Sequence, residues 1–226
     1  MRVLFVHEVD WSTKPVFEMH EFPERLAARG HEVTFLDYHE AHPGWPWLVR
    51  RRVAGRTLRH VEMDLVSLRP PIGGLPGRLL AAIASWWVAS RVVQREVTDA
   101  VVLYGVPTDG PAVCWWGRRR GIPVVYRAID VSHLLRETAL APLVRLAERR
   151  VVRTATHVST HNPALAAHVR RLAGRPVEVS VLPPGFDLGP EPTPEDTGRL
   201  RARLGIADAE RVILYRGTVY RFSGVL

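Results

Sequence analysis

The sequence contains a single cysteine, Cys114, and a single lysine, Lys14, among its 226 residues. One cysteine cannot form a disulfide within the chain, which excludes a disulfide-stabilised scaffold and favours a reducing compartment. The first residues, MRVLFVHEVD, lack a long apolar core followed by a small-residue cleavage site, so no signal peptide is predicted. The longest strongly apolar run, residues 79–89, is shorter than the roughly 18–20 residues that a membrane span needs. We therefore expect a cytoplasmic protein.

Positive charge comes almost entirely from arginine. The chain has 31 Lys and Arg against 23 Asp and Glu, a net charge of +8. A basic surface suits phosphate, acidic lipid or nucleic acid, although arginine-rich usage is also typical of a GC-rich genome. Binding of nucleic acid further requires an element that reads bases through aromatic or groove-fitting side chains, and the sequence offers none. A nucleic-acid-binding function is therefore not predicted.

Short apolar runs alternate with segments of helical periodicity along the chain. The predicted strands are residues 2–7, 32–38, 63–68, 99–105, 123–130, 156–160 and 177–185. The predicted helices are residues 17–29, 76–96, 107–120, 142–154 and a segment that follows the pair Asn162-Pro163. Strands separated by helices form βαβ units. The sequence therefore predicts an α/β fold with a doubly wound, mostly parallel, Rossmann-like sheet.

Ligands bind beyond the carboxyl ends of the strands in such sheets. Three loops at predicted strand ends stand out: 7–15, 130–133 and 183–187. The first has no glycine, which argues against a dinucleotide-binding G-x-G-x-x-G turn and hence against an NAD-dependent dehydrogenase. His20 and Glu21 begin like a zinc-protease motif, but Glu24 stands where the second histidine would be. No metal site is predicted.

Five stretches together carry a resemblance to a known family. They are RVLFVHEVD, EFPERLAARGHEVTFLDY, HVSTHNPALAAHV, VLPPGFDLGPEP and ILYRGTVYRFSG. In order and spacing they resemble the GT-B glycosyltransferases of the retaining, family-4-like type. The stretch PPGFD is similar to the P-N-G-[VF]-D turn of that family, with Pro184 in place of asparagine.

The resemblance implies two Rossmann-like domains facing a cleft, an N-terminal domain for the acceptor and a C-terminal domain for a sugar nucleotide. On this basis residues 1–188 are the acceptor domain, 189–210 a linker and lead-in, and 211–226 the start of the donor domain, with RVILYRG as its first strand. We then expect the sequence to be a fragment. The implied donor is a nucleotide-diphosphate sugar, the acceptor is a saccharide or a lipid-linked molecule, and no metal cofactor is expected.

The resemblance also indicates roles for individual residues. His133 is similar to a family histidine that bonds hydroxyl groups near the reacting sugar, and it is the candidate catalytic residue. Candidate substrate-binding residues are His7, Glu8, Lys14 and Asp130. Candidate donor-phosphate residues are Arg216, Gly217 and Arg221, because the family loop G-R-x-x-x-x-K-G has Thr218 and Ser223 here in place of its two cations. Structural explanations stay open: His133 as an ordinary loop histidine, His7 as a partner of local backbone groups, and Asp130 as a turn cap.

The stretch GWPWLVRRRVAGRTLRHV, residues 44–61, mixes tryptophan with arginine. Drawn as a helix, it places Arg52, Arg56 and Arg59 on one face, as an interfacial segment on anionic lipid would. We therefore expect peripheral contact with the inner face of the membrane through this stretch. The alternative is a solvated, basic connection between two strands.

A second class of function also fits these observations. The chain could be a non-catalytic Rossmann-like fragment or binding module that keeps the fold without transferase activity. A reading frame that continues past residue 226 with an acidic E-x7-E pattern would favour the enzyme.

Overall fold

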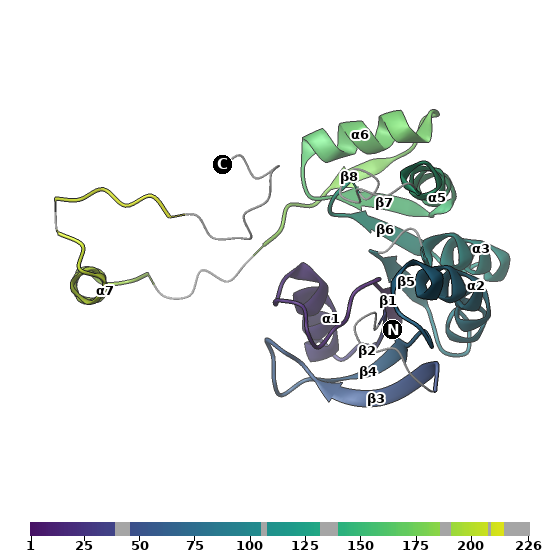
Figure 1. Cartoon of the computed structure of the whole chain (residues 1–226), viewed down its shortest axis with the longest axis horizontal. Helices are drawn as coiled ribbons and strands as arrows, with labels where there is room; N and C mark the ends of the chain where they lie inside the picture. Colours follow the sequence, from purple (N-terminus) through teal and green to yellow (C-terminus); the bar gives the residue numbers. More distant parts are fainter. Residues whose placement is uncertain (39–45, 105–107, 132–139, 186–190, 208, 215–226) are drawn as a thin grey trace. The chain divides into compact units, whose positions relative to one another are not determined.

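The computed structural model describes residues 1–38, 46–104, 108–131, 140–185, 191–207 and 209–214 (Figure 1). The chain divides into two compact units, Met1–Pro184 and Gly185–Leu226. The first unit holds one eight-stranded sheet. Its strands are β1 (Arg2–Val6), β2 (Glu32–Tyr38), β3 (Leu48–Ala54), β4 (Glu62–Leu68), β5 (Ala100–Leu103), β6 (Val124–Ala128), β7 (His157–Thr160) and β8 (Val179–Val181). Its helices are α1 (Glu18–Ala28), α2 (Gly74–Val92), α3 (Gly110–Arg120), α5 (Ala141–Thr154) and α6 (Pro163–Ala173).

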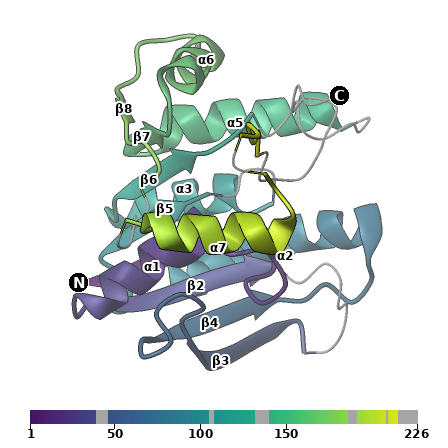
Figure 2. The same ribbon diagram turned by 90° about the vertical axis from the view of Figure 1, so that its left-hand side faces the viewer.

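The strands follow one another across the sheet in the order β3-β4-β2-β1-β5-β6-β7-β8. Every neighbouring pair is parallel except β3 and β4, which are antiparallel. Figure 2 shows β2, β4 and β3 side by side in one half of the sheet. This confirms the predicted α/β class and the mostly parallel, doubly wound sheet. All seven predicted strands are present, although the last is shorter than expected because only residues 179–181 pair with β7.

Helices cover both faces of the sheet, as parallel strands require. Figure 1 shows α1 on one side and α2, α3 and α5 on the other. Alternate residues of β1 accordingly enter two cores: Val3 and Phe5 pack with Met19 of α1, while Leu4 and Val6 belong to the larger core beneath the other helices. The residues that follow a strand inherit this alternation, which directs consecutive side chains of the loop after β1 to opposite faces.

Local signals explain where the helices begin and end. The Asn162 side chain accepts a hydrogen bond from Leu165 N–H at 2.8 Å, and Pro163 is the first residue of α6, as predicted. Gly30 has a φ of +83° just past α1, a left-handed conformation that favours glycine. The helix predicted at residues 76–96 is present as α2, but it begins at Gly74 and ends at Val92.

The prediction of a helix within residues 44–61 is wrong, because Leu48–Ala54 form β3. The strand pairs with β4 and places arginines diagonally across from acidic side chains, with Arg50 Nη2 2.6 Å from Asp64 Oδ2. Arg52 Nε lies 2.9 Å from Glu62 Oε2. Cross-strand ion pairs and backbone pairing outweighed the helical period that the arginines share. The predicted basic helical face therefore does not exist, and Gly44 and Trp45 lie outside the described residues.

The second unit contains α7 (Pro194–Leu204), which lies inside the stretch predicted as a linker and lead-in. The Thr193 side chain accepts a hydrogen bond from Asp196 N–H at 3.1 Å, and the Asp196 carboxylate accepts one from Thr193 N–H. The strand predicted from Arg211 is absent from the described residues 211–214. Ile213 is 99% exposed there, since no strand of this unit pairs with that segment among the described residues.

No helix in the described ranges is long and apolar enough to cross a membrane.

Candidate functional site

The strand order reverses between β1 and β5, because the chain proceeds from β1 toward β2 on one side and returns to β5 on the other. In doubly wound sheets, ligands bind in the crevice outside the carboxyl ends of the strands at such a switch point. The residues at this position are His7 and Glu8, after β1, and Tyr104, after β5. Two of the predicted substrate-binding residues therefore lie at the place that the topology itself marks as a binding site.

His7 stands on the face of the sheet that α1 covers. Its ring stacks on that of Tyr104, with centroids 5.4 Å apart and planes 14° from parallel. The ring of Phe17, just before α1, meets His7 edge-on at 6.2 Å. His7 is buried between these two aromatic side chains. The imidazole is thus fixed in orientation, as a residue that positions a ligand hydroxyl must be.

A buried polar network is centred on Glu18, the first residue of α1. Arg127 of β6 donates from Nε and Nη2 to the two Glu18 oxygens at 2.7 and 2.8 Å. Arg127 also donates from Nη1 to Ser159 Oγ of β7 at 3.0 Å, and the Tyr104 hydroxyl donates to Glu18 Oε1 at 3.3 Å. Burial, followed by the Glu18 charge, raises the pKa of Tyr104, so its hydroxyl keeps its proton. The network joins α1 to β6, through Arg127 to β7, and to Tyr104, the residue on which His7 stacks.

Glu8 points to the opposite face and meets the first turn of α3. Its carboxylate accepts hydrogen bonds from Thr108 N–H and, at 3.3 Å, from Asp109 N–H. These backbone groups lie at the N-terminal end of the helix, where negative charge is stabilised. Asp109 is buried beside Glu8, and burial together with the Glu8 charge raises the pKa of Asp109 well above its ordinary value. The two carboxyl groups therefore lie together at the N-terminal end of α3.

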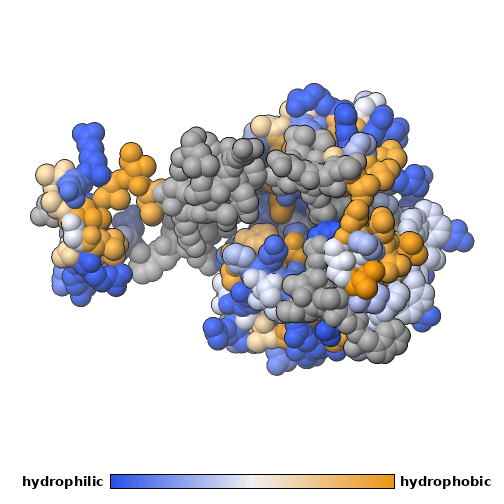
Figure 3. Space-filling view, viewed as in Figure 1, coloured by the Kyte–Doolittle hydropathy of each residue, from blue (hydrophilic) through white to orange (hydrophobic). Residues whose placement is uncertain are grey.

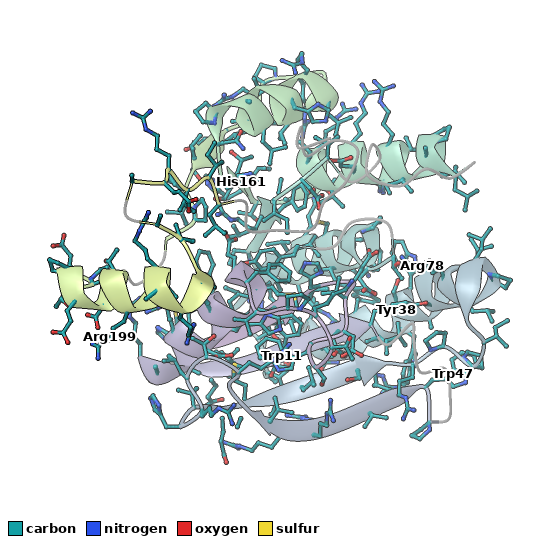
Figure 4. All side chains as sticks on the ribbon, turned by 60° about the vertical axis from the view of Figure 1, so that its left-hand side comes forward. Trp11, Tyr38, Trp47, Arg78, His161 and Arg199 are labelled. Atoms are coloured by element: carbon teal, nitrogen blue, oxygen red, sulfur yellow. The ribbon has the colours of Figure 1, made fainter. Side chains whose placement is uncertain are left out.

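The loop after β1 folds inward around Trp11, which Figure 4 labels beside α1. Trp11 N–H donates to Asp37 Oδ2 at 3.0 Å, and the indole packs between the rings of His20 and Phe35. Asp10 Oδ1 accepts from Ser12 N–H at 2.7 Å and closes the turn. Lys14, a predicted substrate-binding residue, follows this turn and is exposed. Lys14 therefore differs from His7 and Glu8, which are buried.

A hollow of about 320 Å³ lies at the ends of β6 and β7. Its lining residues come from the loop after β6 and from the start of α6: Ile129, Asp130, Val131, His161, Asn162, Ala164, Leu165 and His168. His161 is labelled in Figure 4. Two imidazoles and a carboxylate over an apolar floor suit a ligand with several hydroxyl groups. Asp130, predicted as substrate-binding, therefore lines a cavity on the same edge of the sheet as His7.

A larger hollow, about 750 Å³, lies at the opposite edge of the sheet. It includes Arg50, Asp64, Arg52 and Glu62, which form ion pairs with one another. These charges are satisfied within the protein, and the hollow is at the amino ends of the strands. We therefore place the candidate site at the carboxyl edge.

His20, which begins the incomplete zinc-protease pattern, has a structural role. It is fully buried, with Nε2 3.0 Å from Trp11 O, and Nδ1 accepts from Phe17 N–H at 3.3 Å. Glu24 is also buried and accepts three backbone hydrogen bonds from residues 56–58. Among the described residues, no group of three or more His, Cys, Asp or Glu side chains is arranged to hold a metal ion.

Four predicted site residues, His133, Arg216, Gly217 and Arg221, lie outside the described residues. Sequence reasoning missed Glu18, Arg127 and Asp109. Arg127 carried a usable signal, since a charged residue in the middle of the apolar run PVVYRAID must find a buried partner. Glu18 and Asp109 carried none, because an acidic residue near a helix start is usually a solvated cap.

Comparisons with known proteins agree with this fold. The family described as glycosyl transferase 4-like domain matches residues 18–185, so the chain belongs to that family. The D-inositol 3-phosphate glycosyltransferase of Actinosynnema mirum is 34% identical over 153 residues, covering 64% of this chain and 36% of that protein. The chain thus spans about a third of the length of this curated relative.

Solved structures show the same fold. A sucrose-phosphate synthase from Thermosynechococcus elongatus superposes with a TM-score of 0.58 at 13% identity, over 91% of this chain and 52% of that chain. A shorter chain of a sucrose-phosphate synthase from the same organism superposes with a TM-score of 0.51, over 90% of this chain and 98% of the other. The fold of the first unit is accordingly that of one half of a GT-B glycosyltransferase.

Proposed function

We propose that this protein is a retaining glycosyltransferase that transfers a sugar from a nucleotide-diphosphate donor to a saccharide or lipid-linked acceptor. Residues 1–188 bind the acceptor in this proposal, 189–210 form the linker and lead-in, and 211–226 begin the donor-binding part. The observation that carries the proposal is the position of His7 and Glu8 at the switch point of a domain that belongs to a glycosyltransferase family.

The acceptor lies over the carboxyl edge of the sheet. His7, held between Tyr104 and Phe17, bonds one acceptor hydroxyl, and Asp130 bonds another from the neighbouring hollow. Glu8 has a mainly structural role, because its carboxylate accepts hydrogen bonds from backbone N–H groups at the N-terminal end of α3. Lys14 is exposed and contributes charge at the rim of the site.

In the reaction, the acceptor oxygen bonds to the anomeric carbon, and its proton passes to an oxygen of the departing diphosphate. The bond between that carbon and the diphosphate breaks, and the nucleoside diphosphate leaves with the electron pair. The difficult step is the stabilisation of an oxocarbenium-like centre and a departing diphosphate. His133 bonds hydroxyl groups near that centre, and Arg216 and Arg221, on either side of Gly217, counter the diphosphate charge without a metal cofactor.

The proposal is tested with the complete reading frame that contains this sequence. The expressed protein is incubated with a panel of UDP- and GDP-sugars and with saccharide and lipid-linked acceptors, and nucleoside diphosphate release is measured. Release that requires the acceptor, and that His7→Ala reduces while His60→Ala does not, is the expected result. Binding of a sugar nucleotide without turnover in any combination would contradict the proposal and favour a binding module.

We place the protein in the cytoplasm, at the inner face of the membrane, because a lipid-linked acceptor would be met there. The expectation of membrane contact through a helical face of residues 44–61 no longer holds, because Arg50 and Arg52 are paired with acidic residues of β4. Arg56 points inward instead, donating from Nη1 to Trp11 O at 2.9 Å. Membrane contact therefore needs another surface.

A further inference from the structure

Helix α2 carries its large apolar side chains on the outside. Its buried stripe consists of small residues and one valine: Gly77, Ala81, Ser85, Val88 and Ala89. Its exposed stripe consists of large hydrophobic and aromatic residues: Leu75, Leu79, Ile83, Trp86 and Trp87. A helix that only had to fold would show the reverse arrangement. Ile83 is 71% exposed, so most of this apolar side chain remains in contact with water.

The exposed apolar surface continues onto the next helices in the layer. Trp86 of α2 meets Trp115 of α3 edge-on, with ring centroids 5.7 Å apart. On α5, Leu143 and Leu146 are both exposed. Figure 3 shows hydrophobic residues at the surface on the side of the first unit where these helices lie. Exposed apolar patches of this kind mark interaction surfaces.

The same helices concentrate the positive charge of the protein. The four helices α2, α3, α5 and α6 contain eleven arginines and one acidic residue, Glu148, which is fully buried. The rest of the chain holds 20 basic and 22 acidic residues and is slightly negative. The net charge of +8 therefore arises in this one helical layer.

Arginine and tryptophan are paired on this face. The guanidinium of Arg91 lies 5.2 Å from the centre of the Trp87 ring, and that of Arg119 lies 5.5 Å from the Trp115 ring. Arginines 145, 149 and 171 line a hollow of about 690 Å³ between α5 and α6, beside the exposed Leu146. Long arginine stems can lie along an apolar surface while their charged ends reach an anionic layer.

We propose that the outer face of α2, α3 and α5 docks on an anionic lipid bilayer. We call it the α2–α3–α5 face and define it by the exposed residues Leu75, Leu79, Ile83, Trp86, Trp87, Trp115, Leu143 and Leu146 with their neighbouring arginines. Apolar and aromatic side chains enter the interfacial region, and the arginines bind lipid phosphates. The inference stands on exposure and charge and does not require the proposed transferase activity.

The positive charge and the apolar residues of this face together favour an anionic bilayer over the other possible binding partners. A second copy would place one strongly basic face against another, which is electrostatically unfavourable. A nucleic acid would pair with the arginines but would leave Leu79 and Ile83 without an apolar partner. An anionic bilayer satisfies both the charge and the apolar residues. Because α2 follows β4, its N-terminal end lies toward the carboxyl edge of the sheet, where the candidate site is.

The test is flotation of the full 226-residue chain with vesicles of phosphatidylcholine, with and without phosphatidylglycerol. We expect the chain to float only with the anionic vesicles and to be released by raising the salt concentration to about 0.5 M. The double variant Ile83→Glu/Trp87→Glu should lower the vesicle-bound fraction roughly tenfold or more. The double variant Arg145→Glu/Arg149→Glu should weaken binding to anionic vesicles, since it reverses two charges on the same face.

Two single-residue controls introduce the same kinds of change elsewhere. Val97→Glu introduces an acid at an apolar residue that is 51% exposed but lies outside the α2–α3–α5 face. Arg59→Glu reverses an exposed charge in the β3–β4 connection. Both should bind vesicles as the parent does, and thermal melts should show that every variant is folded. Failure of the parent to float, equal flotation of parent and Ile83→Glu/Trp87→Glu, or a concentration-dependent dimer that this variant abolishes would each overturn the proposal.

Discussion

Arg127 and Glu18 form a two-point ion pair although 109 positions separate them in the sequence. Both guanidinium contacts are shorter than 2.9 Å, and the Arg127 side chain is only 2% exposed. The pair connects the start of α1 to β6, and Glu18 accepts a further hydrogen bond from the hydroxyl of Tyr104, on which His7 is stacked. A structural contact thus determines where a candidate substrate-binding residue stands.

Removing one partner of this ion pair should cost much more stability than its replacement by an apolar pair. Arg127→Met leaves the Glu18 carboxylate without its main partner, and we expect the free energy of unfolding to fall by about 3–5 kcal/mol. The double change Arg127→Met/Glu18→Leu removes both charges and should recover a large part of that loss. Urea titration followed by circular dichroism measures both values.

The control for this prediction is Arg52→Met, which removes an ion pair with Glu62 whose partners are 69% and 62% exposed. Exposed pairs contribute little, so its cost should stay below about 1 kcal/mol. Similar losses for Arg127→Met and Arg52→Met would show that the buried ion pair contributes no more to stability than an exposed one.

The buried imidazole of His20 should make stability fall as the pH is lowered. Burial lowers the pKa of His20 below its ordinary value of 6.5. The unfolded chain therefore binds the proton first, and the stabilising contribution present above pH 6.5 is lost as the pH falls toward the folded-state pKa. The loss amounts to at most about 1.4 kcal/mol per pH unit. Urea titrations at a series of pH values from 7.5 to 5 measure it.

His20→Gln isolates this contribution, because the amide can donate and accept hydrogen bonds but does not titrate in that range. The difference in stability between the parent and His20→Gln should shrink as the pH falls. His60→Gln, at an exposed position, should leave the pH dependence as it is. A parent and a His20→Gln variant with parallel pH profiles would disprove the assignment.

The fold could be predicted from the sequence because its signals are local. Short apolar runs, Gly30 after a helix and the pair Asn162-Pro163 each report on a few neighbouring residues, and each was confirmed. β3 was missed because its arginines carry a helical period in the sequence, while its strand character depends on backbone pairing with the next strand, β4. The information that decided this element lay outside the element.

The candidate site was predictable only in part, for the same reason. His7, Glu8 and Asp130 could be placed at the carboxyl edge, since strand ends are visible in the sequence. The role of Glu8 at the first turn of α3 depends on a contact 100 positions away and was not foreseen. The exposed stripe of α2 could not be foreseen, because apolar composition does not reveal which side of a helix faces the sheet.

His133 in the complete enzyme should affect turnover more than binding. If it bonds a hydroxyl more strongly in the transition state than in the ground state, His133→Ala should lower kcat by about 10²–10³-fold with little change in KM. Steady-state kinetics with the best donor and acceptor measure both constants, and a thermal melt checks folding. An unchanged kcat would make His133 an ordinary loop residue.

The 226-residue chain on its own should not transfer sugar. It spans 36% of the curated relative and 52% of the synthase chain, and the residues proposed to hold the diphosphate are only Arg216, Gly217 and Arg221. Incubation of the purified chain with sugar nucleotides and acceptors should give no product above a His133→Ala background. Turnover above that background would contradict the proposal that the acceptor and the donor are bound by different parts of the protein.

The end of the chain should be dispensable for the stability of the first unit. Val212, Ile213 and Leu214 are 55%, 99% and 84% exposed, so they contribute little buried surface, and the described residues 211–214 form no strand. Apolar side chains of this kind would each contribute roughly 1.5–3 kcal/mol if buried, and their exposure instead favours self-association. A chain truncated after Asp187, near the boundary between the two units at Pro184, should be more soluble and should melt at the temperature of the parent. Scanning calorimetry and light scattering of both chains make the comparison.

A fall of several kcal/mol in the free energy of unfolding of the truncated chain, or slow hydrogen exchange at amides 212–214 in the parent, would show that the tail is part of the folded core.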